Sequence, residues 1–225
     1  MNITLSRLNM GIADNMIIKR HSNQKKIKRC LDIVIALPIT LIALPIIFIS
    51  CIAIRIESKG SPIYKQKRSG FRGTEFVVYK LRTMYDRSSE GNLSAPKPGD
   101  SRVTKVGKFL RMTSIDELPQ FINVIKGEMS ILGPRAIPEK EIELRIENMM
   151  KNDSSKTEDY RRAMQIRRLM KPGISGMAQA YGRSSLTTEE ATAYDIYYVL
   201  EYSLFLDVKI FFKTIDTILF RKGVN

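Results

Sequence analysis

The chain has few of the residues on which histidine, cysteine and zinc chemistry depends. Its 225 residues include one histidine, two cysteines and no tryptophan. His21 lies in a polar N-terminal stretch, and Cys30 and Cys51 form neither a disulfide framework nor a metal-ligand spacing. The sequence also contains no dinucleotide-binding fingerprint, Walker loop or catalytic triad. These absences exclude the enzyme classes that those motifs define, and they argue against zinc.

Acidic residues are scarce relative to basic ones. The chain has 37 lysines and arginines against 23 aspartates and glutamates, a formal net charge of +14. A balance of this kind indicates a polyanionic partner, which is either a nucleic acid or an anionic membrane surface. Because the chain has no zinc-finger spacing, RNP-like aromatic motif or basic zipper, we expect no nucleic acid among its partners. The length suits one domain, or a domain with an attached segment.

One long hydrophobic run interrupts this charged sequence. Residues 31–54 contain Asp32 as their only charge, and as a straight helix they would extend roughly 36 Å, enough to cross a bilayer core. The run is too long for the core of a signal peptide, and a buried helix of a soluble protein is the alternative. We predict a basic leader over residues 1–28, poorly ordered or lying on the surface, a membrane helix over residues 29–57, and a domain over residues 58–225.

Two features predict that this helix does not simply cross the membrane. Pro38 and Pro45 each remove a helical hydrogen bond, so the helix should bend. Basic residues also flank it on both sides, whereas a spanning helix normally has its basic flank on the cytoplasmic side. The flanking cations are Lys19, Arg20, Lys25, Lys26, Lys28 and Arg29 before it, and Lys59, Lys65, Lys67, Arg68 and Arg72 after it. We therefore predict a re-entrant helix with both ends on the cytoplasmic side.

Two adjacent carboxylates, Asp116 and Glu117, precede a proline and a short apolar run. Proline is well tolerated in the first turn of a helix and glycine commonly follows the last, so we predict a helix from near Pro119 to Gly127. We expect three of its apolar residues to face inward: Phe121, Ile122 and Ile125. The simplest interpretation makes Asp116 the N-cap of this helix. The alternative is a catalytic pair at the positive end of a helix, where anions bind.

Cations on a neighbouring segment favour the catalytic interpretation. Residues 63–84 predict a β-hairpin with Gly70 and Gly73 in its turn. The strand period of two places Lys80 and Arg82 on one face of the second strand. Two cations on one face suit a diphosphate, and simple solvated strand charges are the alternative.

A glycine-rich stretch, residues 171–183, begins at Lys171 and ends at Arg183. Its three glycines, Gly173, Gly176 and Gly182, would let backbone N–H groups approach an anion closely. The two flanking cations would add charge, although a bare loop of this kind is a weak signal by itself.

These segments together resemble the motifs of a known family. The stretches KLRTM, SIDELPQFINVIKGEMSILGPR and KPGISGMAQAYGR occur in the order found in the bacterial sugar transferases, specifically the small monotopic phosphoglycosyl transferases, and the resemblance extends over residues 28–223. Such enzymes move a phosphosugar from a UDP-sugar to polyprenol phosphate and release UMP. The resemblance implies this activity at the cytoplasmic face of the inner membrane. It also implies an α+β, mostly helical fold with a re-entrant helix, a short β-hairpin and amphipathic interface helices.

The resemblance also implies roles for individual residues. Asp116 would be the nucleophile that forms an aspartyl-phosphosugar, and Glu117 would help it to hold Mg²⁺. The implied substrate-binding residues are Lys80, Arg82, Arg111, Arg135, Lys171, Gly173, Gly176, Gln179, Arg183 and Asp195.

Three positions bear on how closely the chain follows the family pattern. Ala136 stands where a proline usually follows the arginine, and Leu44 stands where a serine usually precedes the proline at position 45. Residues 177–179 lack a tryptophan that some hexose-transferring relatives carry, which favours an acetamido sugar.

The remaining segments predict supporting structure. Residues 86–101 predict a mobile loop, and residues 137–170 a charged insertion to which no chemistry is assigned. Residues 102–111 form a basic amphipathic pattern that lies on a membrane or packs on the core, and both readings stay open. The end of the chain, residues 203–222, predicts an amphipathic helix because its charges argue against spanning. A second copy of the chain stays open as a partner, and the rival to an enzyme is a non-catalytic membrane adaptor that binds anionic lipid.

Overall fold

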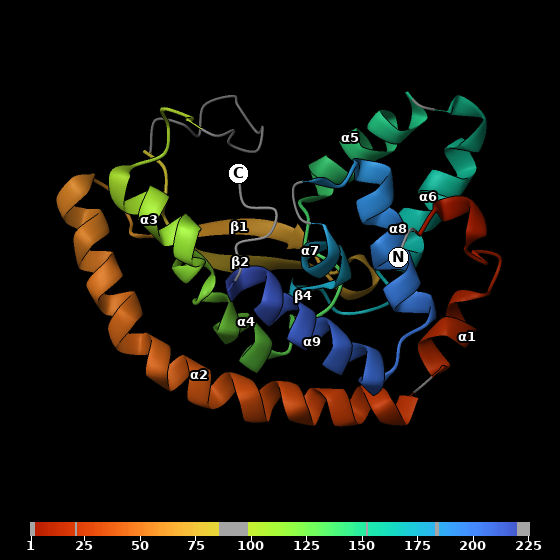
Figure 1. Cartoon of the computed structure of the whole chain (residues 1–225), viewed down its shortest axis with the longest axis horizontal. Helices are drawn as coiled ribbons and strands as arrows, with labels where there is room; N and C mark the ends of the chain where they lie inside the picture. The colour runs from red at the N-terminus through yellow and green to blue at the C-terminus, as the bar shows by residue number, and fades with distance from the viewer. Residues whose placement is uncertain (1–2, 21, 86–98, 152, 183–184, 220–225) are drawn as a thin grey trace.

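The computed structural model describes residues 3–20, 22–85, 99–151, 153–182 and 185–219. Within these ranges the chain is mostly helical, with two small two-stranded sheets. Figure 1 shows that the long helix α2 curves around one side of the molecule, that the hairpin β1–β2 crosses the middle, and that α5, α6 and α8 pack together on the other side. The predicted α+β, mostly helical fold is confirmed.

The helix α2, Ser22–Glu57, continues through Pro38 and Pro45 and is bent along its length (Figure 1). The bend is expected because each proline removes one hydrogen bond from the helix. The helix begins earlier than the predicted residue 29, and it is the one described helix that is long and apolar enough to cross a membrane. Its buried stripe includes Ala36, Ala43, Ser50 and Ile54, whereas most of its other apolar side chains are exposed.

The N-terminal leader is folded onto the domain. It forms a 3-10 turn, η1 (Leu5–Arg7), and a short helix, α1 (Asp14–Lys19). Three of its apolar side chains are buried in the largest core: Ile3, Leu5 and Ile17. Arg162 holds the segment by donating hydrogen bonds to two leader carbonyls and to the carboxylate of Asp14. The prediction of a poorly ordered or surface-lying leader is corrected, because apolar residues without a regular period still supply tertiary packing.

The predicted hairpin is confirmed. Strands β1 (Ile63–Ser69) and β2 (Glu75–Leu81) pair antiparallel. Their connection, η2 (Phe71–Gly73), reverses the chain with positive φ angles of 55° at Arg72 and 78° at Gly73. Most of the loop predicted at residues 86–101 lies outside the described residues.

The carboxylate pair lies in the single 3-10 turn η4 (Ile115–Glu117). This turn connects helix α3 (Lys105–Thr113) to helix α4 (Gln120–Lys126). Gly127, with φ 83°, follows α4 at the predicted end of the helix. The chain therefore reaches α4 through an extra turn, and the two carboxylates lie in that turn.

The inward face of α4 differs from the prediction. Ile122 is 38% exposed, while Asn123 and Val124 are buried and Phe121 and Ile125 are partly buried. Asn123 decides this orientation because it hydrogen-bonds the backbone of β2, donating to the carbonyl of Val77 at 2.7 Å and accepting from the N–H of Tyr79 at 3.2 Å. The hydrogen bonds of Asn123 therefore determine which face of α4 is buried, whereas the sequence predicted that apolar residues would determine it.

Helices α5 (Glu139–Met150), α6 (Thr157–Arg167) and α8 (Thr188–Leu200) enclose the largest core. The first two contribute Ile142, Ile146, Met149, Tyr160, Ala163, Met164 and Ile166 to it. The segment predicted as an insertion without a role is therefore a structural part of the domain. A short parallel pair, β3 (Ser130–Leu132) and β4 (Gly173–Ser175), joins this part to the region of α4. The other described helices are η5 (Ser154–Lys156), α7 (Met177–Tyr181) and α9 (Leu204–Leu219).

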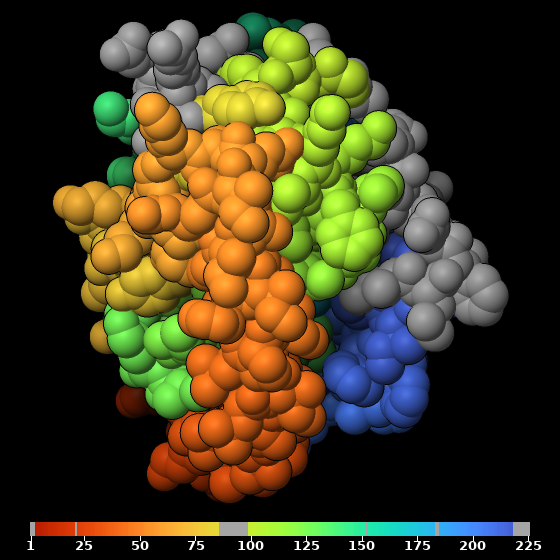
Figure 2. All heavy atoms as spheres, turned by 90° about the vertical axis from the view of Figure 1, so that its left-hand side faces the viewer, coloured from red at the N-terminus to blue at the C-terminus, as the bar shows by residue number. Residues whose placement is uncertain are grey.

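Helices α3 and α9 are amphipathic, as their sequences predict. In α3, Leu110 is buried beside α2, while Phe109 and Met112 on the outer face are 55% and 51% exposed. One face of this segment therefore packs on the core, and contact of its exposed face with a membrane stays a prediction. In α9, Ile210 is buried and Phe205 and Phe212 are exposed. Figure 2 shows α3 and α9 beside α2 on one side of the molecule.

Candidate active site

The carboxylate pair lies in η4, in the turn between α3 and α4. Ser114 adopts a left-handed conformation with φ 57° and ends α3, so the chain turns sharply before Asp116. Pro119 occupies the N-cap of α4 and no side chain caps that helix. The prediction that Asp116 is the N-cap is therefore wrong, because the 3-10 turn keeps Asp116 away from the first N–H groups of α4. Neither carboxylate is explained as a helix cap.

Glu117 is held by the hairpin. Its Oε1 atom accepts a hydrogen bond from Nζ of Lys80, at 2.6 Å, and both side chains are about three-quarters buried or more. Lys80 is the penultimate residue of β2. A short, partly buried ion pair fixes both groups more firmly than a surface pair would.

Asp116 lies in a half-buried position where its negative charge is disfavoured. Burial raises the pKa of Asp116 to about 6, and the negative charge of Glu117 adds to the effect. The positive charges of Lys80 and Arg111 oppose it. A carboxyl group poised near neutral pH by burial and a like charge is a common feature of catalytic sites.

Arg111 approaches the pair from the last turn of α3. Its Nε atom donates to the hydroxyl of Thr83 at 2.7 Å. This bond leaves its terminal guanidinium nitrogens without an acceptor among the described residues. The structure therefore brings Asp116, Glu117, Lys80 and Arg111 together around one turn.

Arg82 takes a different direction from Lys80. It lies just beyond the end of β2 and is buried, and its guanidinium donates to the carbonyls of Ser58 and Lys59 at 2.8 and 2.7 Å. The strand period does not hold past Leu81, so the two cations do not share the predicted face. Arg82 connects the end of the hairpin to the end of α2.

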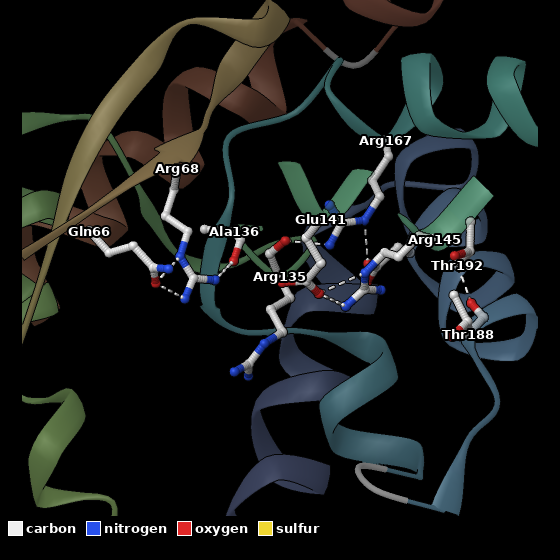
Figure 3. Close-up of polar contacts among 10 residues, drawn as sticks. Gln66, Arg68, Arg135, Ala136, Glu141, Arg145, Arg167, Thr188 and Thr192 are labelled. Carbon is white, nitrogen blue, oxygen red and sulfur yellow. Dashed lines mark hydrogen bonds and ion pairs between the residues drawn. The ribbon is translucent and has the colours of Figure 1, made fainter. Parts of the chain in front are cut away.

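Arg135 follows β3 and its side chain is exposed. In Figure 3 its guanidinium points away from the group formed by Glu141, Arg145 and Arg167. Arg68 of β1 projects beside it: Nη1 donates to the carbonyl of Ala136 at 2.5 Å (Figure 3). Sequence reasoning counted Arg68 only as part of the basic flank of α2, although the strand period could have placed it on the hairpin face that carries Lys80.

Asp195 is connected to Arg135 through Arg167. It is 3% exposed, and its Oδ2 atom accepts from Nε of the buried Arg167 at 2.7 Å. The same Arg167 donates to the backbone carbonyl of Arg135 (Figure 3). Asp195 therefore reaches the site through two intermediaries, and sequence reasoning missed Arg167, which lay in the supposed insertion.

The glycine-rich stretch is packed against the bend of residues 133–136, which we call the Arg135 turn. Gly173 donates its N–H to the carbonyl of Pro134 at 3.0 Å, so this N–H is already used. A side chain at Gly173 would place Cβ 2.2 Å from the nitrogen of Gly133, and one at Gly176 would place it 2.1 Å from the oxygen of Gly133. Both glycines are thus required for two backbone segments to approach closely.

The other residues of this stretch lie apart from the carboxylate pair or outside the described residues. Lys171 lies with Arg29 beside Gly127, at the far end of α4, and burial together with Arg29 lowers the pKa of Lys171. Gln179 donates to the carbonyl of Ile174 at 3.1 Å. Arg183 is not among the described residues.

The carboxylate pair is small for a protein-only metal site. Among the described residues, no three histidine, cysteine, aspartate or glutamate side chains cluster as a metal site. Mg²⁺, however, is commonly held by one or two carboxylates together with phosphate oxygens of the substrate and waters. Two adjacent carboxylates beside several cations fit this mode of binding.

A carboxylate pair, cations from separate elements and an adjoining long apolar helix are typical of enzymes that act on phosphate groups at a membrane. Residues 23–221 match the model of the family described as Bacterial sugar transferase. The chain belongs to this family.

Curated relatives agree with this assignment. The chain is 36% identical over 200 residues to a UDP-glucose:undecaprenyl-phosphate glucose-1-phosphate transferase of Caulobacter vibrioides, covering 85% of this chain and 69% of the relative. It is 37% identical to a UDP-N-acetylgalactosamine-undecaprenyl-phosphate N-acetylgalactosaminephosphotransferase of Aeromonas hydrophila, covering 88% of this chain and 45% of the relative. It is also 36% identical to the uncharacterized sugar transferase EpsL of Bacillus subtilis, covering 88% and 90%.

Proposed function

We propose that this chain transfers a sugar 1-phosphate from a UDP-sugar to undecaprenyl phosphate and releases UMP, which starts the assembly of a surface polysaccharide. The family assignment and the names of the relatives support the reaction class. The observation that carries the proposal in this chain is the placement of Asp116: a half-buried carboxyl with a pKa near 6, free of any capping role, surrounded by Glu117, Lys80 and Arg111.

In the proposed reaction Asp116 is the nucleophile. A carboxylate oxygen of Asp116 attacks the phosphorus that carries the sugar, and the bond from that phosphorus to the bridging oxygen breaks. UMP leaves with the bridging oxygen and its electron pair, and an aspartyl-phosphosugar remains. A phosphate oxygen of the polyprenol phosphate then attacks the same phosphorus and displaces the carboxylate. Atoms and charges balance without a redox partner.

The cations around the turn make this attack feasible. An anionic carboxylate is repelled by an anionic diphosphate, so positive charge must lie beside the reacting phosphorus. Lys80 holds Glu117 in place, and Arg111 and Arg135 offer guanidinium groups to phosphate oxygens. Glu117, with Asp116, would hold Mg²⁺, which when bound supplies further neutralisation of the phosphate oxygens.

Arg82, Asp195, Gly173 and Gly176 are proposed to position the site. Arg82 fixes the end of the hairpin against α2, Asp195 acts through Arg167, and the two glycines seat the Arg135 turn. Substrate contacts remain proposed for Arg111, Arg135 and Gln179, and Lys171 has no contact with the carboxylate pair that would support the same role.

We also propose that α2 is re-entrant and that the enzyme works at the cytoplasmic face of the membrane. Polar contacts bind both ends of α2 to the same folded body. Near the start Lys28 pairs with Asp207 at 2.8 Å, and at the end Glu57 accepts from the backbone N–H groups of Lys105 and Val106. One compact body cannot lie on both sides of a bilayer, so the exposed apolar face of α2 would enter and leave on one side.

The proposed membrane surface continues beyond α2. Phe109 and Lys108 of α3 and Phe205, Lys209 and Phe212 of α9 are exposed. These two helices lie beside α2 (Figure 2). Apolar side chains bordered by lysines are typical of helices that lie in the interface of an anionic membrane.

Topology can be measured with single cysteines. Cysteines placed one at a time at exposed positions within residues 5–20 and 60–75 should be protected from an impermeant thiol reagent added outside intact cells and should react in inverted vesicles. Reaction of the N-terminal positions from outside would establish a spanning helix instead.

The Asp116→Asn variant tests the activity. We expect turnover to fall by at least about a thousandfold, because removal of a catalytic nucleophile can cost up to about a millionfold, while folding and membrane binding persist. Exposed Glu75→Gln on the hairpin is the matched control and should retain activity. Near-normal turnover in a well-folded Asp116→Asn protein contradicts the nucleophile assignment and favours the non-catalytic adaptor.

A further inference from the structure

Arg68 is a half-buried cation near Arg135 that has no role in the reaction proposed above. It lies on β1, directly opposite Phe76 of β2 in the antiparallel register. Opposed residues share a face of the sheet, and so do residues two apart on one strand. Arg68 therefore lies on the same hairpin face as Gln66 and as Lys80, the residue that binds Glu117.

The contacts of Arg68 are all with neutral oxygens. Its Nε and Nη2 atoms donate to Oε1 of Gln66 at 3.0 and 2.5 Å, and Nη1 donates to the carbonyl of Ala136 at 2.5 Å. No carboxylate lies within ion-pair distance of it in the described part of the chain. A guanidinium has five N–H groups, so one N–H on each terminal nitrogen is left without an acceptor among these residues.

The position of Arg68 is electrostatically unfavourable in the absence of an anion. Burial lowers the pKa of Arg68 to about 10, and the positive charge of Arg135 adds to the effect, against the smaller influence of Glu141, Tyr64 and Glu117. Two guanidinium groups held near each other without a carboxylate between them repel, and an anion placed between them would remove that repulsion.

The side chain is nevertheless held firmly. Gln66 binds one edge of the guanidinium through two hydrogen bonds, and the backbone of the Arg135 turn binds another part of it (Figure 3). The same contacts orient Arg68 toward the Arg135 turn. A cation fixed in this way has already lost the side-chain freedom that binding would otherwise remove.

Resting on the proposed function, we propose that Arg68 is a substrate-binding residue that acts with Arg135 on the phosphate of the departing nucleotide, and that Gln66 positions it. The turn η4, which carries Asp116, holds the phosphorus that carries the sugar. The second phosphate of the UDP-sugar, which leaves as UMP, then has Arg68 and Arg135 as its partners on the same face of the hairpin. Arg68 stabilises this phosphate as negative charge develops on the bridging oxygen.

Binding of UMP and of uridine to the full-length protein in nanodiscs tests this role. Loss of charge-assisted hydrogen bonds should weaken UMP binding by Arg68→Gln about ten- to one-hundredfold, while uridine, which lacks the phosphate, should bind as it does to the wild type. Lys67→Gln removes a charge from the opposite face of the same strand, where Lys67 pairs with exposed Glu75, and should change neither affinity.

A second variant separates binding from folding. Gln66→Glu keeps Arg68 but gives it a carboxylate partner, so thermal stability should not fall while UMP binding should weaken. Equal UMP affinity in Arg68→Gln and wild type overturns the inference, as does equal weakening of UMP and uridine. If Arg68→Gln does not fold, wild-type UMP affinity in Gln66→Glu overturns it. Failure of the wild type to bind UMP at all would instead contradict the proposed function itself.

Discussion

Two groups of arginines occupy different regions of this protein. In the region of α5 and α6, four arginines pair with carboxylates: Arg145 with Glu141, Arg162 with Asp14, Arg167 with Asp195 and Arg168 with Glu139. In the region of η4 and the hairpin, Arg68, Arg111 and Arg135 form no ion pair within the described residues. The first group stabilises the protein's own structure, and we propose that the second binds the phosphates of the substrate.

The two regions also differ in the size of their hydrophobic cores. The largest hydrophobic cluster lies in the region of α5, α6 and α8, while the hairpin and α4 rest on a small cluster around Val78 and Val124. Stability therefore resides mainly in the helical region. The region of η4 can therefore hold a carboxylate whose charge is disfavoured, beside arginines that have no ion pair among the described residues, which a region responsible for stability could not easily tolerate.

The largest difference between the two groups should appear in turnover. Arg135→Ala removes a guanidinium that we propose binds phosphate, so we expect kcat/KM to fall about a hundredfold or more with little change in Tm. Arg145→Ala, from the paired group, should change turnover by less than about threefold. Measuring kcat/KM and Tm for both variants checks this. Full rescue by Arg135→Lys would reduce Arg135 to a general positive charge.

The paired group should show its largest effect in stability. Asp195→Asn leaves Arg167 buried without its carboxylate, which typically costs about 3–5 kcal/mol of unfolding free energy. The pair formed by Asp14 and Arg162 provides the control because it is more exposed than the Arg167 pair, so Asp14→Asn should cost about 1 kcal/mol or less. Denaturant titration distinguishes the two. Equal small losses would show that the Arg167 pair is not needed to hold the carbonyl of Arg135.

Much of the structure around η4 could be predicted from sequence, because local rules govern it. Gly127 ends α4, the hairpin turns at Gly70 and Gly73, and the carboxylate pair precedes Pro119. The capping role of Asp116 could not be predicted correctly. It depends on Ser114 adopting a positive φ, which inserts a 3-10 turn that no hydrophobic period reveals.

The errors elsewhere arose where tertiary contacts decide. Gly173 and Gly176 look like an anion-binding loop in sequence, but the same residue is needed wherever two backbones approach, and here both contact Gly133. The unpaired state of Arg68 and the paired state of Arg167 depend on partners distant in the chain. Net charge and local spacing cannot distinguish these two states.

A smaller effect concerns the metal that the carboxylate pair would hold. Glu117→Gln keeps the shape of the side chain but removes the charge that Mg²⁺ prefers. We expect the Mg²⁺ concentration for half-maximal activity to rise by about tenfold. Exposed Glu75→Gln is the control and should leave the titration unchanged. An unchanged Mg²⁺ titration for Glu117→Gln would contradict a role for Glu117 in holding the metal.

The smallest effect is a shift in pH dependence, and it separates the charges that act on the nucleophile from those that do not. Because the pKa of Asp116 is raised to about 6, kcat/KM should fall about tenfold per pH unit below that value as the carboxylate is protonated. Lys80 lowers this pKa, so Lys80→Gln should move the acidic limb of the pH profile to higher pH. Lys126 hydrogen-bonds Tyr79 instead, so Lys126→Gln is the control and should not move that limb.

The raised pKa of Asp116 also predicts a change in stability with pH: the wild-type protein should lose stability relative to Asp116→Asn as pH rises from about 4 to about 6. The Tm of Asp116→Asn minus the Tm of the wild type should therefore increase over this pH interval. If this Tm difference stays constant, burial does not raise the pKa of Asp116.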